Sequence, residues 1–368
     1  MRNDELCWMS AWDLARAIAH RRVSPVEVVD AVLDRIGRLK SLNAYCLVDA
    51  EGARRAAKVA EREATKRRAR LGPLHGVPFS VKDLVVTKGL TTTFGTPLYR
   101  ENVPTEDAPS VERMKRAGAI MLGKTNTPTL GWVGVTDNLL FGATVNPWSR
   151  DHTPGGSSGG AGAAVAAGLG PLAIGTDGGG SIRKPAAWCG IFGLKASYGR
   201  VAVHPHGAAW SLSHAGPMTR TVRDAALMLN AVAGPDERDQ YSLPADSTDY
   251  VKALRGSLKG LRVAYSDFEK WDLLLSPTVA CPPLRLGEWF ATEIGGKPVG
   301  RDAGSVFTFP FNMTGQPAAT VPCGFTKAGL PIGLQVVGRR FADALVLRAS
   351  AAIETAQPWA DRRPEPGS

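Results

Sequence analysis

Hydrophobic and polar positions along the chain follow two spacings, one typical of helices and one typical of strands. Between residues 10 and 38, apolar residues recur at helical spacing in two segments, and the second begins at Ser24-Pro25 with Glu27 in its first turn. Helices are also predicted at residues 111–117 and 222–233. Short apolar runs predict strands at residues 79–84, 119–122, 261–265 and 272–278. Because the two signals alternate, we expect an α/β fold with a largely buried sheet.

A glycine-rich stretch at residues 155–200 stands apart from this pattern. It holds two glycine-rich loops, one with Ser157 and one with Ser181, and the apolar run 161–174 between them predicts a buried helix followed by a strand. Glycines beside a serine let backbone N–H groups approach a substrate. The phosphate-loop pattern GxxxxGK[ST] is absent, and Ser181 lacks the Gly-X-Ser-X-Gly context of α/β-hydrolases. Considered alone, the loops are explained most simply as turns around a buried helix.

Taken together, the two loops resemble the signature of the amidase signature family, serine hydrolases that cleave carboxamide C–N bonds. The matching segments are residues 155–160, 175–183, 185–187 and 193–195, and the similarity extends over nearly the whole chain. This resemblance implies an amidase-signature fold, in which helices cover both sides of a central, mixed and largely buried β-sheet. The sequence shows neither internal repeats nor a clear linker, so we expect one amidase domain over residues 1–368.

The resemblance also implies a Ser–Ser–Lys catalytic triad. In the family pattern, Ser181 is the nucleophile, and Lys82, within Val81-Lys82-Asp83, is the base. Ser157 relays the proton between them and lies in a cis peptide. Lys82 must be neutral to accept a proton, and burial favours the neutral form by lowering the pKa of a lysine. Without the resemblance, a lysine in a short apolar strand would be interpreted as an edge residue facing water.

Several residues around Ser181 are expected to support the reaction. Four backbone N–H groups are predicted to form the oxyanion hole, those of Gly178, Gly179, Gly180 and Ser181. Ser158 is expected to be a hydrogen-bonding neighbour. Asp177 and Arg183 flank the loop with opposite charges and are predicted to form an internal ion pair, with substrate-carboxylate binding as the alternative for Arg183. Lys124, in another glycine-bearing loop, is expected to be structural or adjacent to the substrate.

The predicted strands 261–265 and 273–275 are both expected to be buried in the sheet, and they lie unusually close together in the sequence. Parallel neighbours in a sheet need a crossover of about a dozen residues or more, and only residues 266–272 separate these two. Members of the family carry a further stretch of about a hundred residues at this place, beside the substrate entrance. We therefore expect that a segment is missing between Ser266 and Asp267.

Charge and cysteine content narrow the range of partners. Much of the net charge of +10 comes from residues 54–70, where eight Lys and Arg accompany two Glu. Interleaved alanines favour a helix with a solvated basic face over a site for nucleic acid or another acidic partner. The five cysteines are scattered without CxxC spacing, so neither disulfides nor a zinc site is predicted. The sequence contains no apolar run long enough to span a membrane and begins without a signal-peptide pattern, which favours the cytoplasm.

The resemblance implies hydrolysis of a small-molecule amide, without metal or cofactor. We expect no nucleic-acid or membrane partner, and a homodimer remains an open alternative. Two other functions remain: the amidase (glutaminase) subunit of a glutamyl-tRNA amidotransferase, which needs partner subunits, and a catalytically dead homologue that serves as a binding module. The intact Lys82, Ser157 and Ser181 argue against the dead homologue. Three tryptophans near the signature would favour an aryl or apolar acyl group if they line the site, and are otherwise core residues: Trp132, Trp188 and Trp210.

Overall fold

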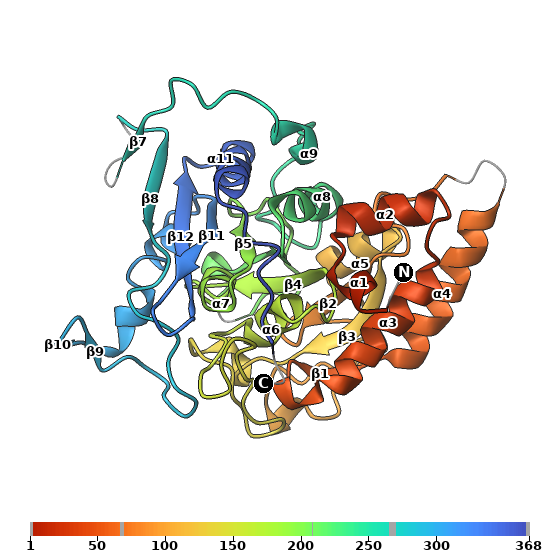
Figure 1. The fold of residues 1–368 in the computed structure, drawn as a ribbon, viewed down its shortest axis with the longest axis horizontal. Helices are drawn as coiled ribbons and strands as arrows, with labels where there is room; N and C mark the ends of the chain where they lie inside the picture. The colour runs from red at the N-terminus through yellow and green to blue at the C-terminus, as the bar shows by residue number, and fades with distance from the viewer. Residues whose placement is uncertain (1–2, 67–69, 208, 265–269, 366–368) are drawn as a thin grey trace.

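A large mixed β-sheet organises the chain (Figure 1). The computed structural model describes residues 3–66, 70–207, 209–264 and 270–365. Within these ranges the main sheet has ten strands. Their spatial order is β1 (Tyr45–Val48), β3 (Ile120–Thr125), β2 (Pro78–Lys82), β4 (Leu172–Asp177), β6 (His214–Thr219), β5 (Phe192–Lys195), β11 (Ala318–Phe325), β12 (Pro331–Gly338), β8 (Leu273–Pro277) and β7 (Val263–Ala264). A separate pair consists of β9 (Glu293–Ile294) and β10 (Lys297–Pro298).

Helices cover both faces of this sheet. They are α1 (Asn3–Trp8), α2 (Ala11–Ala19), α3 (Pro25–Arg38), α4 (Ala50–Thr65), α5 (Pro109–Arg116), α6 (Gly159–Ala166), α7 (Arg183–Cys189), α8 (Val222–Val232), α9 (Tyr250–Ala253), α10 (Pro310–Met313) and α11 (Asp343–Ala356). A Cβ added at Gly333 of β12 would lie 2.5 Å from Ala187 Cβ in α7, whereas one added at Gly338 would lie 2.7 Å from Val346 Cγ2 in α11. Because side chains alternate along a strand, α7 and α11 pack on opposite faces, as Figure 1 also shows. The predicted fold class is confirmed.

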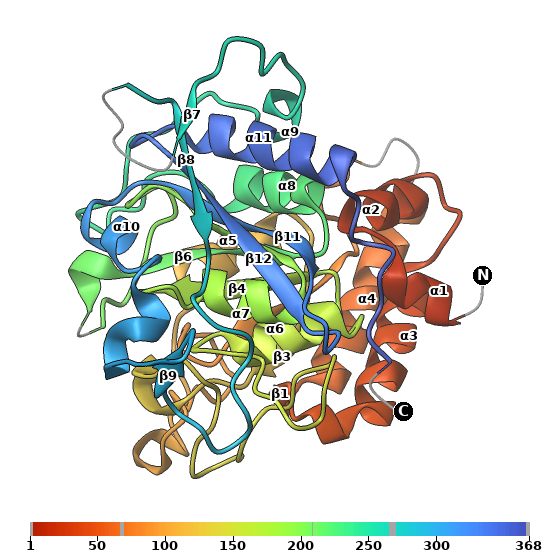
Figure 2. The same ribbon diagram turned by 60° about the vertical axis from the view of Figure 1, so that its left-hand side comes forward.

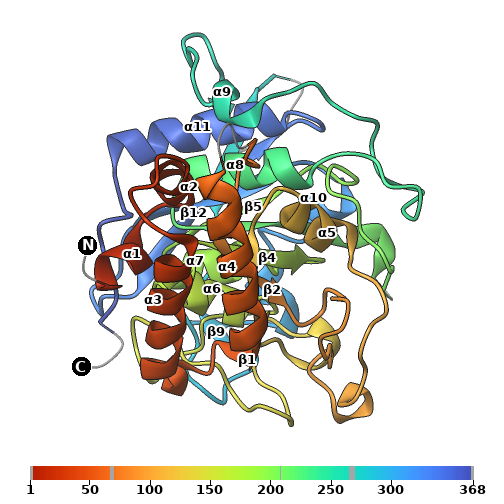
Figure 3. The ribbon, with the colours of Figure 1, turned by 90° about the vertical axis from the view of Figure 1, so that its right-hand side faces the viewer.

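Local sequence signals account for the first helices. Ser24 Oγ accepts the N–H of Val26 at 2.9 Å, and Glu27 accepts the N–H of Ser24 at 2.8 Å, which completes the capping box at the start of α3. Figure 3 shows α3 and α4 side by side on the outside of the molecule. Only alanines of α4 are buried, at positions 53, 57, 60 and 64, so its basic residues face outward as predicted.

The predicted buried helix and strand within the signature are confirmed as α6 and β4. Every residue of α6 is buried. A Cβ at Gly162 would lie 3.1 Å from Cys189 Sγ, so the small residues of α6 let it pack closely against α7. The helix therefore fixes the position of the Ser157 loop, which immediately precedes it.

Strand directions bring the two halves of the site to one edge of the sheet. β2 is parallel to both β3 and β4. The carboxyl ends of parallel strands meet at the same edge, where ligands commonly bind in open α/β sheets. Lys82 is the last residue of β2 and Asp177 is the last residue of β4. The Ser181 loop follows β4 directly, so it lies at the same edge of the sheet as Lys82.

The strands β7 and β8 differ from the sequence prediction in their burial. Val263 of β7 is 45 % exposed, because β7 forms the outer edge of the sheet rather than part of its interior (Figure 2). The prediction of a buried strand at 261–265 is therefore wrong for its described residues. β7 and β8 are parallel neighbours, with Val263 opposite Leu273, and residues 265–272 are all that connects them. The junction of Ser266 and Asp267 itself lies outside the described residues.

Candidate active site

Lys82 is the buried centre of the site. The Lys82 side chain has no exposed surface, and its Nζ donates hydrogen bonds to Ser157 Oγ at 2.7 Å and to Thr176 Oγ1 at 2.9 Å. Burial lowers the pKa of Lys82 well below its usual value, and the negative charge of Asp177 offsets this only in part. The lysine is thus held as a hydrogen-bonding amine within reach of a serine hydroxyl.

The Ser157 loop is fixed by hydrogen bonds to its backbone. The peptide bond between Gly156 and Ser157 is cis. Thr127 Oγ1 donates to the Ser157 carbonyl at 2.9 Å, and Thr136 Oγ1 donates to the Gly155 carbonyl at 2.8 Å. With its backbone carbonyls engaged, the loop presents the Ser157 hydroxyl to Lys82.

The Ser158 side chain ties the two loops together. Its Oγ donates to the Thr176 carbonyl at 3.0 Å and accepts the Thr176 N–H at 3.2 Å. Its backbone N–H donates to the Ser181 carbonyl at 3.2 Å. Ser158 therefore connects the loop that carries Ser157 to the loop that carries Ser181.

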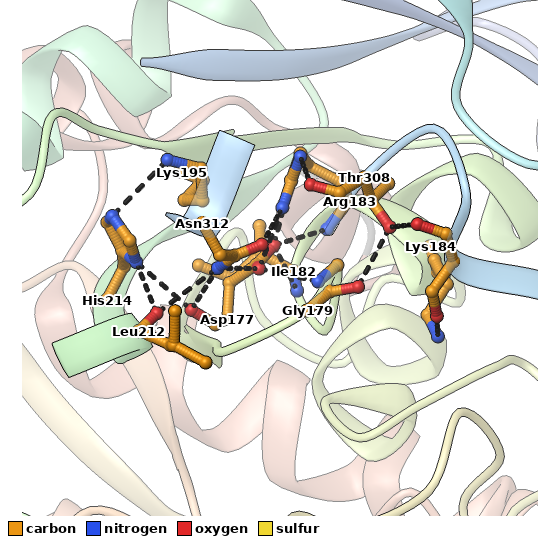
Figure 4. Close-up of polar contacts among 12 residues, drawn as sticks. Asp177, Gly179, Ile182, Arg183, Lys184, Lys195, Leu212, His214, Thr308 and Asn312 are labelled. Atoms are coloured by element: carbon orange, nitrogen blue, oxygen red, sulfur yellow. Dashed lines mark hydrogen bonds and ion pairs between the residues drawn. The ribbon is translucent and has the colours of Figure 1, made fainter. Parts of the chain in front are cut away.

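Asp177 shapes the turn that leads to Ser181 (Figure 4). Its carboxylate accepts the backbone N–H groups of Gly180 at 2.7 Å and Ile182 at 3.1 Å. Burial by itself would raise the pKa of Asp177, but the charge and hydrogen bonds of Arg183, with Asn312, hold that pKa well below the usual range. The Asp177 carboxylate thus fixes the backbone on both sides of Ser181, the candidate nucleophile.

The predicted ion pair between Asp177 and Arg183 is formed, and Arg183 NH2 lies 3.0 Å from Asp177 Oδ1. The guanidinium is fully buried and also donates to acceptors from distant parts of the chain. These are the Thr308 carbonyl at 2.9 Å, Gln335 Oε1 at 2.8 Å and Asn312 Oδ1 at 2.6 Å. Because its donors are used in this way, Arg183 holds the loop and faces away from any substrate carboxylate.

The predicted oxyanion hole is only partly available. The N–H of Gly180 is engaged by Asp177, so it does not point toward a substrate. In the described structure the N–H groups of Gly178, Gly179 and Ser181 have no protein acceptor, and these three residues line the cavity. A Cβ at Gly178 would meet no atom within 4 Å, so space is left beside the loop there.

A cavity of about 1310 Å³ opens onto both serines. Its walls are largely apolar and include several aromatic side chains, and Trp132 packs against Trp289 with ring centroids 5.6 Å apart. Trp132 and Trp188 line the cavity, as one of the two alternatives expects, whereas Trp210 packs against Tyr241 with centroids 5.1 Å apart. Two of the three tryptophans are therefore placed to contact a substrate.

The proton relay predicted through Ser157 needs a hydrogen bond between the two serine hydroxyls, and the described structure does not form one. Among the described residues, Ser181 Oγ has no hydrogen-bond partner, while Ser157 Oγ is held by Lys82. Catalytic hydrogen bonds are often long without a substrate and shorten when one binds. Proton transfer from Ser181 to Lys82 through Ser157 therefore requires that the two hydroxyls come within hydrogen-bond distance when a substrate binds.

Lys124 has a structural position. Its Nζ donates to Val85 O at 2.5 Å, Thr87 Oγ1 at 3.0 Å and Thr92 Oγ1 at 2.8 Å, and it lies 3.8 Å from Asp83 Oδ1. It does not line the cavity. These contacts anchor the segment that follows Lys82.

Sequence reasoning missed several residues that complete the site. Thr176 accepts a hydrogen bond from Lys82. It lies inside a segment that matches the family signature, so the sequence could have drawn attention to it. Lys195 is fully buried behind the loop, 3.3 Å from His214 Nε2. Nothing in the local sequence marks Thr308, Asn312 or Gln335, because each reaches Arg183 from more than 100 residues away.

Within the described ranges, no group of three or more His, Cys, Asp or Glu side chains could hold a metal ion. Nor does any described helix have the length and apolar character needed to cross a membrane.

The fold and this geometry together define a class: an α/β protein in which a buried lysine and two serine-bearing loops lie at one edge of the sheet. Residues 27–271 and 266–347 match the model of the Amidase family. The chain belongs to this family and is an enzyme that hydrolyses amide C–N bonds.

Relatives and solved structures agree with the family match. An acylamidase of Rhodococcus erythropolis is 36% identical, over 99% of this chain and 98% of its own length. One of the subunits of the glutamyl-tRNA(Gln) amidotransferase of Moorella thermoacetica is 32% identical, over 99% of each chain. The structure of a bacterial aryl acylamidase of the amidase signature family superimposes with a TM-score of 0.89 at 28% identity, over 96% of this chain and 97% of that chain.

The alignments are longer than the chain. The match to the acylamidase extends over 474 positions, whereas the chain has 368 residues, so at least 106 aligned positions (474 − 368) have no residue here. The family match is also divided into two parts that meet at residues 266–271. Both observations agree with the short connection between β7 and β8.

Proposed function

We propose that the chain hydrolyses a small-molecule carboxamide through an acyl-enzyme on Ser181. The observation that carries this proposal is the 2.7 Å hydrogen bond from the fully buried Lys82 to Ser157, next to the cavity that Ser181 lines. A serine hydroxyl is a weak nucleophile and needs a neighbouring base. Lys82, whose pKa burial lowers, supplies that base through Ser157.

In the first half of the reaction, Ser181 Oγ attacks the carbonyl carbon and passes its proton to Ser157, whose own proton moves to Lys82. The N–H groups of Gly178, Gly179 and Ser181 stabilise the oxyanion that develops. Return of the proton to the amide nitrogen breaks the C–N bond and leaves the acyl group on Ser181. In the second half, a water molecule attacks the acyl-enzyme by the same proton route and releases the acid.

One relative keeps a second function in view. Because a glutamyl-tRNA(Gln) amidotransferase component matches 99% of the chain, release of ammonia from glutamine with partner subunits is the alternative. An acylamidase with 36% identity favours a small amide instead. Turnover of simple amides by the purified chain without partners would decide for the first function.

The test is a panel of amides and esters with mass-spectrometric trapping of the acyl-enzyme. We expect a mass increase equal to the acyl group on Ser181, no turnover by Ser181→Ala, and at least about a 100-fold loss in Ser157→Ala, the usual scale for an acid–base partner. A Ser181→Ala variant that still turns over the amide would overturn the proposal.

We further propose that the enzyme works in the cytoplasm on a small amide, without a nucleic-acid or membrane partner. The cysteines support a reducing compartment, because all five are free: Cys7, Cys46, Cys189, Cys281 and Cys323. Light scattering of the purified protein would distinguish a monomer from the homodimer that remains open.

Finally, we propose that one amidase domain spans residues 1–368 and lacks a segment of the family between Ser266 and Asp267. The parallel neighbours β7 and β8 support this, because such strands normally need a longer crossover. An intact mass of 39.0 kDa would mean that the segment is deleted from the protein. A mass that is larger by the mass of about a hundred residues would mean that the protein contains the segment.

A further inference from the structure

Lys184 is a buried lysine that the proposed mechanism does not use. It lies in the first turn of α7, three residues after Ser181, and is 8 % exposed. Its side chain extends away from the network around Arg183 (Figure 4). It lines the same cavity as Ser157 and Ser181, and a Cβ placed on Gly134 in the cavity wall would lie 2.7 Å from Lys184 Nζ.

The polar surroundings of this ammonium are incomplete. Lys184 Nζ donates one hydrogen bond, to Ser305 Oγ at 2.9 Å. An ammonium has three N–H donors, and among the described side chains no carboxylate lies within ion-pair distance of it. Lys124, by contrast, has three oxygen acceptors and lies 3.8 Å from Asp83. Lys184 therefore keeps donors for a ligand in the cavity.

The cavity as a whole favours an anion. Among the described side chains that line it none is acidic, whereas four are basic: Lys184, Arg301, His204 and His206. The two histidines already face carboxylates, those of Glu106 and Asp239. Arg301 lies over the ring of Phe290, 5.5 Å from its centroid. Positive charge in a cavity with apolar walls attracts anionic ligands.

We propose that Lys184 binds a carboxylate of the substrate, so that the enzyme prefers anionic amides to uncharged amides of the same size. This inference rests on the proposed hydrolysis at Ser181. Because Lys184 follows Ser181 by three residues and lines the same cavity, the carboxylate lies a few bonds from the scissile carbonyl. Two short classes have this spacing: half-amides of dicarboxylic acids, with the carboxylate on the acyl side, and N-acyl amino acids, with the carboxylate on the amine side.

Burial lowers the pKa of Lys184 to about 8. The ammonium therefore predominates at neutral pH, and it remains available to pair with a carboxylate.

Binding without turnover tests this proposal. Calorimetry on Ser181→Ala compares succinamate with succinamide, and N-acetylglycine with N-propylacetamide. We expect the charged member of at least one pair to bind tenfold or more tightly, and the pair that shows the preference identifies the side of the scissile bond on which the carboxylate lies. Because no turnover is required, this outcome is independent of whether Ser181 proves to be the nucleophile.

Variants on the same background assign the preference to Lys184. In Lys184→Met and Lys184→Gln the charged and the uncharged ligand of the pair should bind with about equal affinity. The affinity for the uncharged ligand should stay unchanged. Ser305→Ala should keep it, because this variant removes the hydrogen bond but keeps the ammonium, and Lys327→Met at an exposed position should keep it too. Equal binding of charged and uncharged ligands, or a preference that survives in whichever Lys184 variant folds, overturns the proposal.

Discussion

Lys82 and Lys124 lie on the neighbouring parallel strands β2 and β3, and both are fully buried. Lys82 is held by two hydroxyls, those of Ser157 and Thr176, beside the cavity. Lys124 is surrounded by three oxygens and a nearby carboxylate, away from the cavity. Burial lowers the pKa of both, to about 8 for Lys124, where Asp83 opposes the shift, and well below the usual value for Lys82.

The comparison shows that two equally buried lysines can have very different neighbours, and only one of them lies beside the cavity. A buried lysine accepts protons when its neighbours are themselves able to exchange a proton with a substrate and when no adjacent carboxylate stabilises the ammonium. Lys82 contacts Ser157 beside the cavity and forms no ion pair with a carboxylate among the described residues, although the charge of Asp177 offsets part of its pKa shift. Lys124 lies away from the cavity, 3.8 Å from Asp83 Oδ1. Activity, its pH dependence and stability should therefore respond differently when Lys82 or Lys124 is replaced.

Replacing Lys82 gives the largest expected effect. Lys82→Met should lower kcat/KM by at least about 100-fold, because the proton route from Ser181 loses its acceptor. The melting temperature should not fall, since a methionine of similar length removes the cost of burying an amine. Near-normal activity in this variant would refute the role of Lys82 as base.

The pH dependence of activity should report the same lysine. The reaction needs neutral Lys82, so kcat/KM for an uncharged amide should fall about tenfold per pH unit below the lowered pKa of Lys82 and level off above it. The substrate in this measurement is uncharged, so that its binding does not depend on the charge of Lys184. The titration of Lys184 then adds no further slope to the plot of kcat/KM against pH. A pH optimum at or below about 5 would contradict a neutral lysine base.

Replacing Lys124 should affect stability more than chemistry. Lys124→Met leaves Asp83 Oδ1, which has no hydrogen bond of its own, without its cationic neighbour. We expect the free energy of unfolding to decrease by about 2 kcal/mol, the cost of a buried polar group left without a partner. Urea unfolding measures this, with Lys82→Met as the matched control. Equal stability losses in the two variants would erase the distinction between the two lysines.

The exposed basic face of α4 should give the smallest effect. Arg55→Gln, Lys58→Gln and Arg62→Gln combined should leave kcat/KM and stability nearly unchanged, because these side chains are solvated and far less constrained than the buried lysines. Salt-sensitive binding of RNA or DNA that disappears in the combined variant would show instead that this face binds a nucleic acid.

Much of the fold followed from short-range patterns. The capping box of α3, the alanine stripe of α4 and the order of α6 and β4 within the signature each depend on residues a few positions apart. The loops with Ser157 and Ser181 could be located because they are part of a long, specific motif. The catalytic roles of the two serines remain predictions. The burial of β7 was predicted wrongly, because an apolar run does not reveal whether its strand lies at the edge of a sheet.

The sequence by itself indicated several of the helices and strands and, through the family resemblance, the segments that hold the candidate nucleophile, relay and base. Only the tertiary structure decided what those residues contact. It placed Thr176 on Lys82, engaged the N–H of Gly180 with Asp177, and left Lys184 facing the cavity. The physical reason is that a contact such as the one between Thr176 and Lys82, which are 94 residues apart, depends on the order of strands in the sheet, and no local spacing encodes that order.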